Sequence, residues 1–172
     1  MSSLLEAALD YASKGYAVFP LHNPLPDRTC SCRNPKCKKS VGKHPRTRSG
    51  VFSATTDPET IKKWWTQWPD ANIAIATGRK SGIFVIDVDA DRGGEETLRS
   101  LEAQNEKLPP TATVITGGGG RHLYFDCPEH QTVRNSQDKL GPGIDVRGDN
   151  GYVVAPPSRH SSGKVYQWLK TA

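Results

Sequence analysis

Long apolar runs are what this 172-residue sequence most clearly lacks. No stretch approaches the roughly 18 apolar residues that a membrane-spanning helix needs, so the sequence predicts no such helix. Its first residues also lack the basic-then-apolar pattern of a secretory signal, and we therefore expect a cytoplasmic protein. Hydrophobic residues make up only 35% of the chain, which is low but still typical of a globular protein. The length predicts one domain, residues 1–172, that is large enough to bury a core.

Cysteine is scarce, and its distribution is uneven. Three of the four cysteines, Cys30, Cys32 and Cys37, fall within eight positions, and His44 follows them. In a reducing compartment such clustering favours metal binding over disulfides. Three thiols and an imidazole are the ligand set of a closed structural Zn²⁺ site, so we expect a zinc-binding insert at about residues 28–48. Because the C-x-C spacing is tighter than usual, a basic loop with exposed thiols is the alternative.

The insert is also rich in positive charge. Its basic residues would lower the thiol pKa values and favour the thiolates that zinc binds. They are Arg28, Arg33, Lys36, Lys38, Lys39 and Lys43. The whole chain carries a net charge of +5, which is compatible with a polyanionic partner such as nucleic acid or nucleotide. Lys43, Arg46 and Arg48 are candidates for holding phosphates, and a solvated basic loop would explain them equally well.

An apolar run ends abruptly in alternating acids near the middle of the chain. Residues 83–86 have the length and β-branched composition of a buried strand. Side chains alternate along a strand, so Asp87 and Asp89 point to the same face. Two such carboxylates repel each other unless a cation lies between them, and Mg²⁺ or Mn²⁺ takes this kind of oxygen ligand. A solvated turn after the strand is the alternative, and the metal interpretation needs a further acid from elsewhere.

Four consecutive glycines, residues 117–120, separate an expected strand at 111–116 from another at 123–125. Glycine lets the backbone approach a ligand closely and turn several N–H groups toward an anion. Arg121 and His122 follow at once and add donors for phosphate oxygens. A flexible hairpin loop is the alternative. The spacing matches neither a P-loop nor a dinucleotide fingerprint, and no helix follows.

A third acid, Asp145, lies between Ile144 and Val146 on a short expected strand. Its carboxylate would therefore face away from these two apolar side chains. On its own Asp145 would be interpreted as a surface carboxylate. Together with Asp87 and Asp89, it supplies the further acid that a metal site requires.

Local patterns predict the remaining elements. A helix is expected over residues 3–13 and another from Pro58, with Thr56 or Asp57 as its N-cap. The aromatic face of this second helix is expected to be core rather than a surface for stacking bases. We expect a strand at 72–76 to form a hairpin with the strand that carries Asp87. The other expected elements are strands at 16–21, 151–158 and 164–168 and a helix at 95–107.

In combination these motifs resemble those of archaeo-eukaryotic primases. The order of Asp87-Val88-Asp89, Gly120-Arg121-His122 and Ile144-Asp145 is that of the three motifs of these enzymes. The sequence is most similar to the bifunctional primase-polymerase (prim-pol) branch, which plasmids, phages and other mobile elements encode. The stretches that look like this branch are residues 15–21, 42–45, 64–72, 77–78, 117–125 and 145–158. The resemblance thus covers nearly the whole chain.

The resemblance implies an α+β, archaeo-eukaryotic primase-like fold. An antiparallel sheet shaped like an RNA-recognition-motif module would carry the active site, with an N-terminal α/β subdomain packed beside it and a zinc-binding insert. The implied activity is that of a template-directed nucleotidyltransferase, a DNA primase and/or DNA polymerase. Such an enzyme joins nucleoside triphosphates on single-stranded DNA in the replication of a plasmid, phage or other mobile element.

The resemblance also implies roles for single residues. Asp87, Asp89 and Asp145 would hold two Mg²⁺ or Mn²⁺ ions, and His122 would contact the triphosphate of the incoming nucleotide. From charge and position we add further phosphate ligands. They are Arg121, Lys43, Arg147 and the backbone amides of Gly119 and Gly120.

The implied partners are a single-stranded DNA template with its primer, nucleoside triphosphates, and a helicase domain or protein. The sequence has no helicase motif, whereas family members often continue into one, so we expect either part of a longer protein or a stand-alone protein. Two other functions are compatible with the motifs. A metal-dependent nuclease would use the same three carboxylates. A non-catalytic zinc module that binds single-stranded nucleic acid would explain the basic loop and aromatics, but not the acids and the glycine run.

Overall fold

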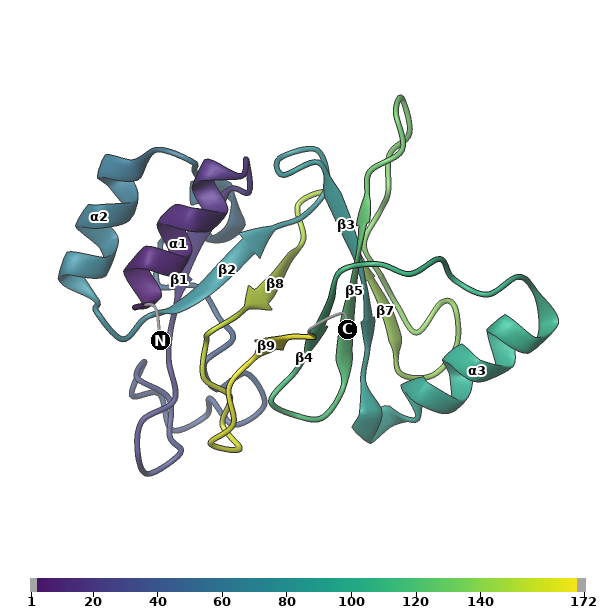
Figure 1. Cartoon of the computed structure of the whole chain (residues 1–172). Coiled ribbons are helices and arrows are strands. Elements are labelled where there is room, and N and C mark those ends of the chain that lie inside the picture. Colours follow the sequence, from purple (N-terminus) through teal and green to yellow (C-terminus); the bar gives the residue numbers. More distant parts are fainter. Residues whose placement is uncertain (1–2, 170–172) are drawn as a thin grey trace.

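The computed structural model describes residues 3–169 and shows an α+β fold with two antiparallel sheets (Figure 1). The smaller sheet has the order β1-β2-β8, with β1 at Val18–Leu21, β2 at Asn72–Ala76 and β8 at Tyr152–Ala155. The larger sheet has the order β6-β7-β3-β5-β4-β9. Its strands are β3 (Ile83–Val88), β4 (Thr113–Ile115), β5 (Arg121–Asp126), β6 (Ser136–Gln137), β7 (Ile144–Arg147) and β9 (Gln167–Trp168).

Helices α1 (Leu4–Ser13) and α2 (Pro58–Gln67) pack against the smaller sheet, and α3 (Gly94–Gln104) lies beside the larger one (Figure 1). Two short 3₁₀ turns, η1 (Gly50–Ser53) and η2 (Ala90–Arg92), precede α2 and α3. Within residues 3–169, every helix is too short or too polar to cross a lipid bilayer.

Both N-terminal helices begin where side-chain caps are available. The hydroxyl of Ser3 accepts a hydrogen bond from the amide of Glu6, whose carboxylate accepts one from the amide of Ser3. At α2 the carboxylate of Asp57 accepts a hydrogen bond from the amide of Thr60, and Pro58 occupies the first helical position. The predicted helix starts are therefore confirmed.

The aromatic face of α2 belongs to the core, as predicted. Ile61 and Trp65 are buried, and the indole N–H of Trp65 donates to the carbonyl of Ala71 at 3.1 Å. Trp64 and Trp68 are partly buried and pack against the same core. These tryptophans hold α2 on the smaller sheet.

Strand β3 lies at the centre of the larger sheet, between β5 and β7. On one of its faces Ile83 and Val85 join the main core, which also contains the residues of α1, α2 and the smaller sheet. On the other face Val88 belongs to a second, smaller core. The other buried members of that core are Leu98, Leu123 and Ile144. Residues of the larger sheet thus contribute to both cores.

The register of the larger sheet brings the expected motifs together. Asp87 lies opposite His122 of β5 on one side and opposite Asp145 of β7 on the other. Direct cross-strand partners share one face of a sheet. These three side chains therefore form a row across the sheet, on the face that carries Val85 and looks toward the smaller sheet.

The expected hairpin between β2 and β3 is wrong. Strand β2 pairs with β1 and β8, whereas β3 pairs with β5 and β7, so each strand is already paired on both edges. The turn between them is closed by an isolated bridge between Gly78 and Ile83, beyond which the chain passes from one sheet to the other. Gly78 has a φ of +78°, and a Cβ at this position would overlap the backbone of Asp149. Only glycine therefore fits at the crossing between the sheets.

Candidate active site and zinc centre

A cavity of about 560 Å³ is lined by residues of both sheets and contains the row of motif side chains. Strands β3, β5 and β7 contribute Asp87, His122 and Asp145, and Tyr152 comes from β8 of the smaller sheet. Asp89 follows the end of β3 and lines the same cavity. The three predicted acids and the predicted histidine thus share one pocket, which we call the acidic pocket.

The acids of this pocket differ in exposure. The side chain of Asp145 is only 5% exposed, and that of Asp87 is 24% exposed. Asp89 is more accessible, and one of its oxygens accepts a hydrogen bond from the amide of Asp91 at 3.1 Å. A carboxylate as buried as Asp145 requires compensating positive charge or hydrogen bonds.

Two guanidinium groups supply that compensation. Nη2 of Arg147 lies 3.3 Å from Oδ2 of Asp87 and 2.8 Å from Oδ2 of Asp145. Arg92 lies 3.0 Å from Asp89 and 3.1 Å from Asp145, and it also pairs with Asp138 at 2.9 Å. Burial lowers the pKa of Arg92, but its hydrogen bonds to Asp89 and Asp145 outweigh this effect and raise the pKa. Sequence reasoning missed Arg92, whose signal was its position three residues after Asp89.

His122 is buried at the edge of this acid row. Its Nε2 lies 3.6 Å from Oδ1 of Asp87, and its ring lies 5.9 Å from that of Tyr166. Burial lowers the pKa of His122 below the usual value, although Asp87 acts in the opposite direction. The imidazole is therefore neutral at pH 7 and has one N–H to donate. Its Nδ1 is buried and has no hydrogen-bond partner among the described residues.

Arg121 does not lie in the acidic pocket, contrary to our expectation. It is the first residue of β5, so its side chain points to the face opposite that of His122. There it forms a two-pronged ion pair with Glu95 of α3, at 2.8 and 2.6 Å. The guanidinium of Arg121 thus fixes α3 to the larger sheet.

The glycine run forms a tight turn rather than a free anion cradle. The amides of Gly119 and Gly120 donate to the carbonyl and the hydroxyl of Thr116, each at 3.0 Å. We expected these two amides to bind phosphate, and the structure commits them to the turn. A Cβ at Gly117 would overlap His160, and one at Gly120 would overlap the carbonyl of Val88. Close packing therefore accounts for these glycines.

Two further positively charged or titratable side chains reach the pocket from outside the larger sheet. Lys43 belongs to the insert between β1 and α2, and its carbonyl accepts a hydrogen bond from the hydroxyl of Tyr152 at 3.1 Å. His160 follows β8 and packs over Gly117. Lys43 was predicted as a phosphate ligand. His160 was not predicted, although it follows the family-like stretch 145–158 by two residues.

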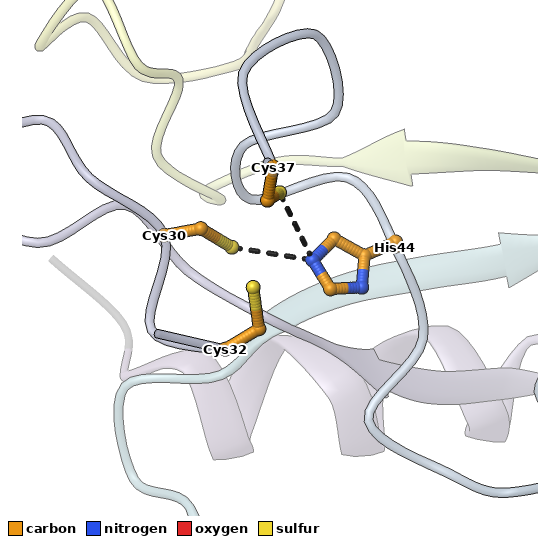
Figure 2. A group of neighbouring side chains, drawn as sticks. All are labelled: Cys30, Cys32, Cys37 and His44. Carbon is orange, nitrogen blue, oxygen red and sulfur yellow. Dashed lines mark hydrogen bonds between the residues drawn. The ribbon is translucent and has the colours of Figure 1, made fainter. Parts of the chain in front are cut away.

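Figure 2 shows the four predicted zinc ligands pointing toward one another from the insert. One ligand atom from each of Cys30, Cys32, Cys37 and His44 lies within 4.8 Å of the other three. Nε2 of His44 is 3.3 Å from the sulfur of Cys30 and 3.4 Å from that of Cys37. In a tetrahedral site, Zn–S bonds of about 2.3 Å and Zn–N bonds of about 2.0 Å separate nitrogen and sulfur by about 3.5 Å. The cluster could therefore bind Zn²⁺ with little adjustment.

The thiol pKa values do not all shift as expected. Burial and the neighbouring thiols Cys30 and Cys32 raise the pKa of Cys37 to about 12. Burial also raises the pKa of Cys30, but hydrogen bonds from the amides of Cys32 and Gly42 outweigh it and lower the pKa. The prediction that the flanking basic residues lower the thiol pKa values is thus wrong for Cys37. Adjacent thiolates repel one another at short range, whereas exposed lysines are screened by solvent.

Arg46 holds the insert against the smaller sheet. Its guanidinium donates to Asn23 at 2.7 Å, to Ser31 at 2.9 Å and to the carbonyl of Leu21 at 3.2 Å. It also lies 5.6 Å from the ring centre of Trp68. Arg46, one of the three basic residues that we considered as phosphate ligands, therefore has a structural role.

The donor chemistry of the acidic pocket suits divalent cations. Carboxylate oxygens are the ligands that Mg²⁺ and Mn²⁺ prefer, and this pocket holds three carboxylates. The guanidinium groups of Arg92 and Arg147 compensate their negative charge in this structure. Between residues 3 and 169, the cysteine-histidine cluster is the one group of three or more His, Cys, Asp or Glu side chains that could hold a metal ion, and its ligand atoms lie within 4.8 Å of one another. Asp87, Asp89 and Asp145 do not form such a group among the described residues, and they pair with Arg92 and Arg147.

Comparison with known proteins identifies a family. The sequence model of the family described as "Bifunctional DNA primase/polymerase, N-terminal" matches residues 8–172, which include every residue of the acidic pocket and of the cysteine-histidine cluster. No curated protein matches the chain.

Proposed function

Because the chain belongs to the family of bifunctional DNA primase/polymerase N-terminal domains, we propose that it is a template-directed nucleotidyltransferase acting on single-stranded DNA. The observation that carries this proposal is the row of Asp87, His122 and Asp145 across three neighbouring strands of one pocket. The two acids are metal ligands, whereas the neutral histidine and the two neighbouring guanidinium groups are phosphate ligands. A nucleoside triphosphate with its divalent ions needs both kinds.

We assign Asp87, Asp89 and Asp145 to the binding of two Mg²⁺ or Mn²⁺ ions. When bound, such ions supply stabilisation of the attacking and leaving oxygens in nucleotidyl transfer. Arg147 already contacts Asp87 and Asp145, so it lies where it can also meet the phosphates of a nucleotide held by these acids. Lys43 lines the same pocket from the insert.

In the reaction the 3′-hydroxyl of the primer or initiating nucleotide loses its proton to water, and its oxygen forms a bond to the α-phosphorus. The bond between that phosphorus and the bridging oxygen breaks, and pyrophosphate leaves. Negative charge grows on the leaving phosphates, and preorganised donors in a partly buried site stabilise it most effectively. The neutral imidazole of His122 would donate its N–H to a phosphate oxygen, while Lys43 and Arg147 would neutralise charge. Arg121, Gly119 and Gly120 have no part in this assignment, because their donors are already used elsewhere.

We further propose that residues 1–172 form one catalytic domain with a primase-like fold, in which the larger sheet is the RNA-recognition-motif-like module. The insert at about residues 28–48 would be its structural zinc element, and the location of Lys43 in it supports this link between insert and pocket. We also propose a role in the replication of a plasmid, phage or other mobile element, and a helicase domain or protein as partner. Both proposals rest on the resemblance alone.

The test is incorporation of labelled nucleotides on a single-stranded template, with and without a primer, in Mg²⁺ or Mn²⁺. We expect Asp87→Asn and Asp145→Asn to reduce incorporation by at least about 100-fold, because each removes a charged ligand from the reacting centre. Asp126→Asn is the matched control, since Asp126 is an exposed acid at the far end of β5. Synthesis by the Asp87→Asn protein at the rate of this control would refute the assignment.

The same experiment distinguishes the alternative functions. A metal-dependent nuclease would shorten the labelled strand when nucleoside triphosphates are left out. A non-catalytic module would bind the template equally well with and without divalent ions and would make no product. The lane without primer shows whether the protein starts new strands or only extends them.

A further inference from the structure

Phe52 is an aromatic side chain exposed on the surface beside the acidic pocket. It is 71% exposed, more than any other large hydrophobic residue in the described part of the chain. Single exposed apolar residues are ordinary on protein surfaces. The surroundings of Phe52 distinguish it from them.

The backbone that carries Phe52 is firmly held. Val51 and Ala54 on either side of it pack into the main core, and the amide of Phe52 donates to the carbonyl of Ser49 at 3.1 Å. The hydroxyl of Thr47 closes the preceding turn on Gly50. The η1 turn thus presents one aromatic ring to solvent from a rigid base.

Two positively charged residues from the turn between the sheets, Arg79 and Lys80, line the same cavity as Phe52. The ammonium group of Lys80 donates to the carbonyl of Phe52 at 3.1 Å. The side chain of Arg79 is 72% exposed and donates to Thr132 at 2.6 Å. Asp149 lines the same cavity: its Oδ1 accepts a hydrogen bond from the amide of Arg79 at 2.8 Å, and its Oδ2 lies 3.7 Å from Nε of Arg79. Two cations and one acid therefore leave a net positive charge around the aromatic face of Phe52.

A second cavity includes this surface and lies next to the acidic pocket. It has a volume of about 340 Å³, and Phe52, Arg79 and Lys80 are among its lining residues. Asn150 lines both this cavity and the acidic pocket. A strand bound along Phe52 would therefore lie beside the wall that Asn150 contributes to the acidic pocket.

We propose that Phe52, Arg79 and Lys80 form a binding site for single-stranded DNA. In this site a base stacks on Phe52, and the backbone phosphates on either side of it pair with Arg79 and Lys80. A rigid aromatic face with adjacent cations is the combination that binds single strands without sequence preference. That the bound strand is the template rests on the proposed function, whereas the binding itself does not.

The test of the stacking contact is the affinity for a fluorescein-labelled oligothymidylate of about 16 nucleotides, measured by anisotropy without divalent ions or nucleotides. We expect Phe52→Leu to weaken binding by about tenfold, because leucine keeps an apolar side chain but has no aromatic face. Phe52→Trp should retain the wild-type affinity. Leu140→Ala, which truncates an exposed apolar residue elsewhere, is the control for general surface effects.

The test of the charged contacts is the salt dependence of the same binding. Each phosphate contact that is lost should reduce the slope of log affinity against log salt by about 0.7 for a single strand. Arg79→Gln and Lys80→Gln should each flatten the slope by this amount. Lys63→Gln, which removes an exposed charge from α2, should leave the slope unchanged.

The results separate this inference from the proposed function. If Phe52→Leu binds the oligothymidylate as tightly as wild type, or if wild type does not bind it, the inference is refuted even where wild type synthesises DNA. If Phe52→Leu instead changes the oligomeric state in sedimentation and leaves DNA affinity unchanged, Phe52 serves an interface between copies and the inference is also refuted. If Phe52→Leu loses binding and wild type makes no product, the inference is supported. Only the proposed polymerase function is then refuted.

Discussion

Single side chains balance the charge of the acidic pocket. Asp87, Asp89 and Asp145 contribute three negative charges, which Arg92 and Arg147 compensate at distances of 2.8 to 3.3 Å. A carboxylate that is 5% exposed, as Asp145 is, loses much of its hydration and depends on these partners. Divalent ions that enter the pocket would take over part of the role that the guanidiniums fulfil.

Replacement of Arg92 tests this balance. We expect Arg92→Gln to lower the free energy of unfolding by about 1–2 kcal/mol without divalent ions, since Asp145 loses a charged partner. Mn²⁺ should then stabilise the variant more than it stabilises wild type, because it replaces the missing positive charge. Urea unfolding with and without Mn²⁺ measures both effects. Arg99→Gln, which breaks an exposed ion pair with Glu96 on α3, should change stability by less than about 0.5 kcal/mol. Equal stabilisation of wild type and Arg92→Gln by Mn²⁺ would contradict the argument.

At the scale of elements, the insert between β1 and α2 has no regular helix or strand between Pro24 and Ser49 within the described chain. Its backbone is held by Arg46 and by the cysteine-histidine cluster, and it delivers Lys43 to the acidic pocket. Zinc bound in such a cluster contributes directly to the stability of the loop that it closes. The insert therefore joins the cysteine-histidine cluster to the wall of the acidic pocket.

Zinc analysis of cysteine variants tests the role of the cluster. We expect about one Zn²⁺ per wild-type chain and much less in Cys32→Ser, because three protein ligands hold a structural ion poorly. The melting temperature of Cys32→Ser should fall by several degrees, and a strong chelator should lower that of wild type similarly. Cys127→Ser, which alters the cysteine outside the cluster, should retain the ion and the melting temperature. Full zinc content in Cys32→Ser would exclude the four-ligand site.

The turn that joins the two sheets provides another comparison at this scale. Gly78 and Gly82 both have positive φ, +78° and +70°, so alanine strains the backbone at either position. An added Cβ meets the backbone of Asp149 at Gly78 and nothing within 4 Å at Gly82. We therefore expect Gly78→Ala to lower the free energy of unfolding by about 2 kcal/mol more than Gly82→Ala, as measured in urea. Equal losses would show that the close approach to Asp149 is unimportant.

At the scale of the whole molecule, one core joins the two sheets. Ile83, Val85 and Tyr124 of the larger sheet lie in the same buried cluster as Ile73 and Ile75 of the smaller one. The acidic pocket lies where the sheets meet, with Tyr152 from the smaller sheet on its wall. The geometry of the site thus depends on the two sheets staying packed together.

This shared core predicts a single cooperative unfolding transition. With zinc present, tryptophan fluorescence and hydrogen exchange of β5 amides should give the same free energy of unfolding. Fluorescence reports mainly on α2, which carries Trp64 and Trp65, whereas β5 belongs to the larger sheet. Separate transitions for the two probes would mean that each sheet folds by itself, and the domain would then consist of two units.

Much of the candidate site was predictable because its signals are local. Alternation along a strand placed Asp87 correctly, and the ligand types at Cys30, Cys32, Cys37 and His44 indicated a cluster that the fold brings together. Arg92 was missed because two of its partners, Asp138 and Asp145, lie 46 and 53 residues away. Its neighbours in the sequence indicate only the pairing with Asp89.

Short-range patterns in the sequence suffice to predict the helix starts, the apolar strands and the chemical types of the ligands, because these depend on side chains only a few residues apart. Which sheet each strand joins, and which face each motif residue occupies, depends on tertiary contacts. Strand β2 pairs with β8, some 80 residues later, instead of with its neighbour β3. Arg121 points away from His122 because β5 begins at Arg121, two residues before the expected start at 123, so both residues lie in the strand and alternate faces. Strand pairing depends on the burial of apolar surface between distant segments, and a shift of one residue moves every side chain to the other face.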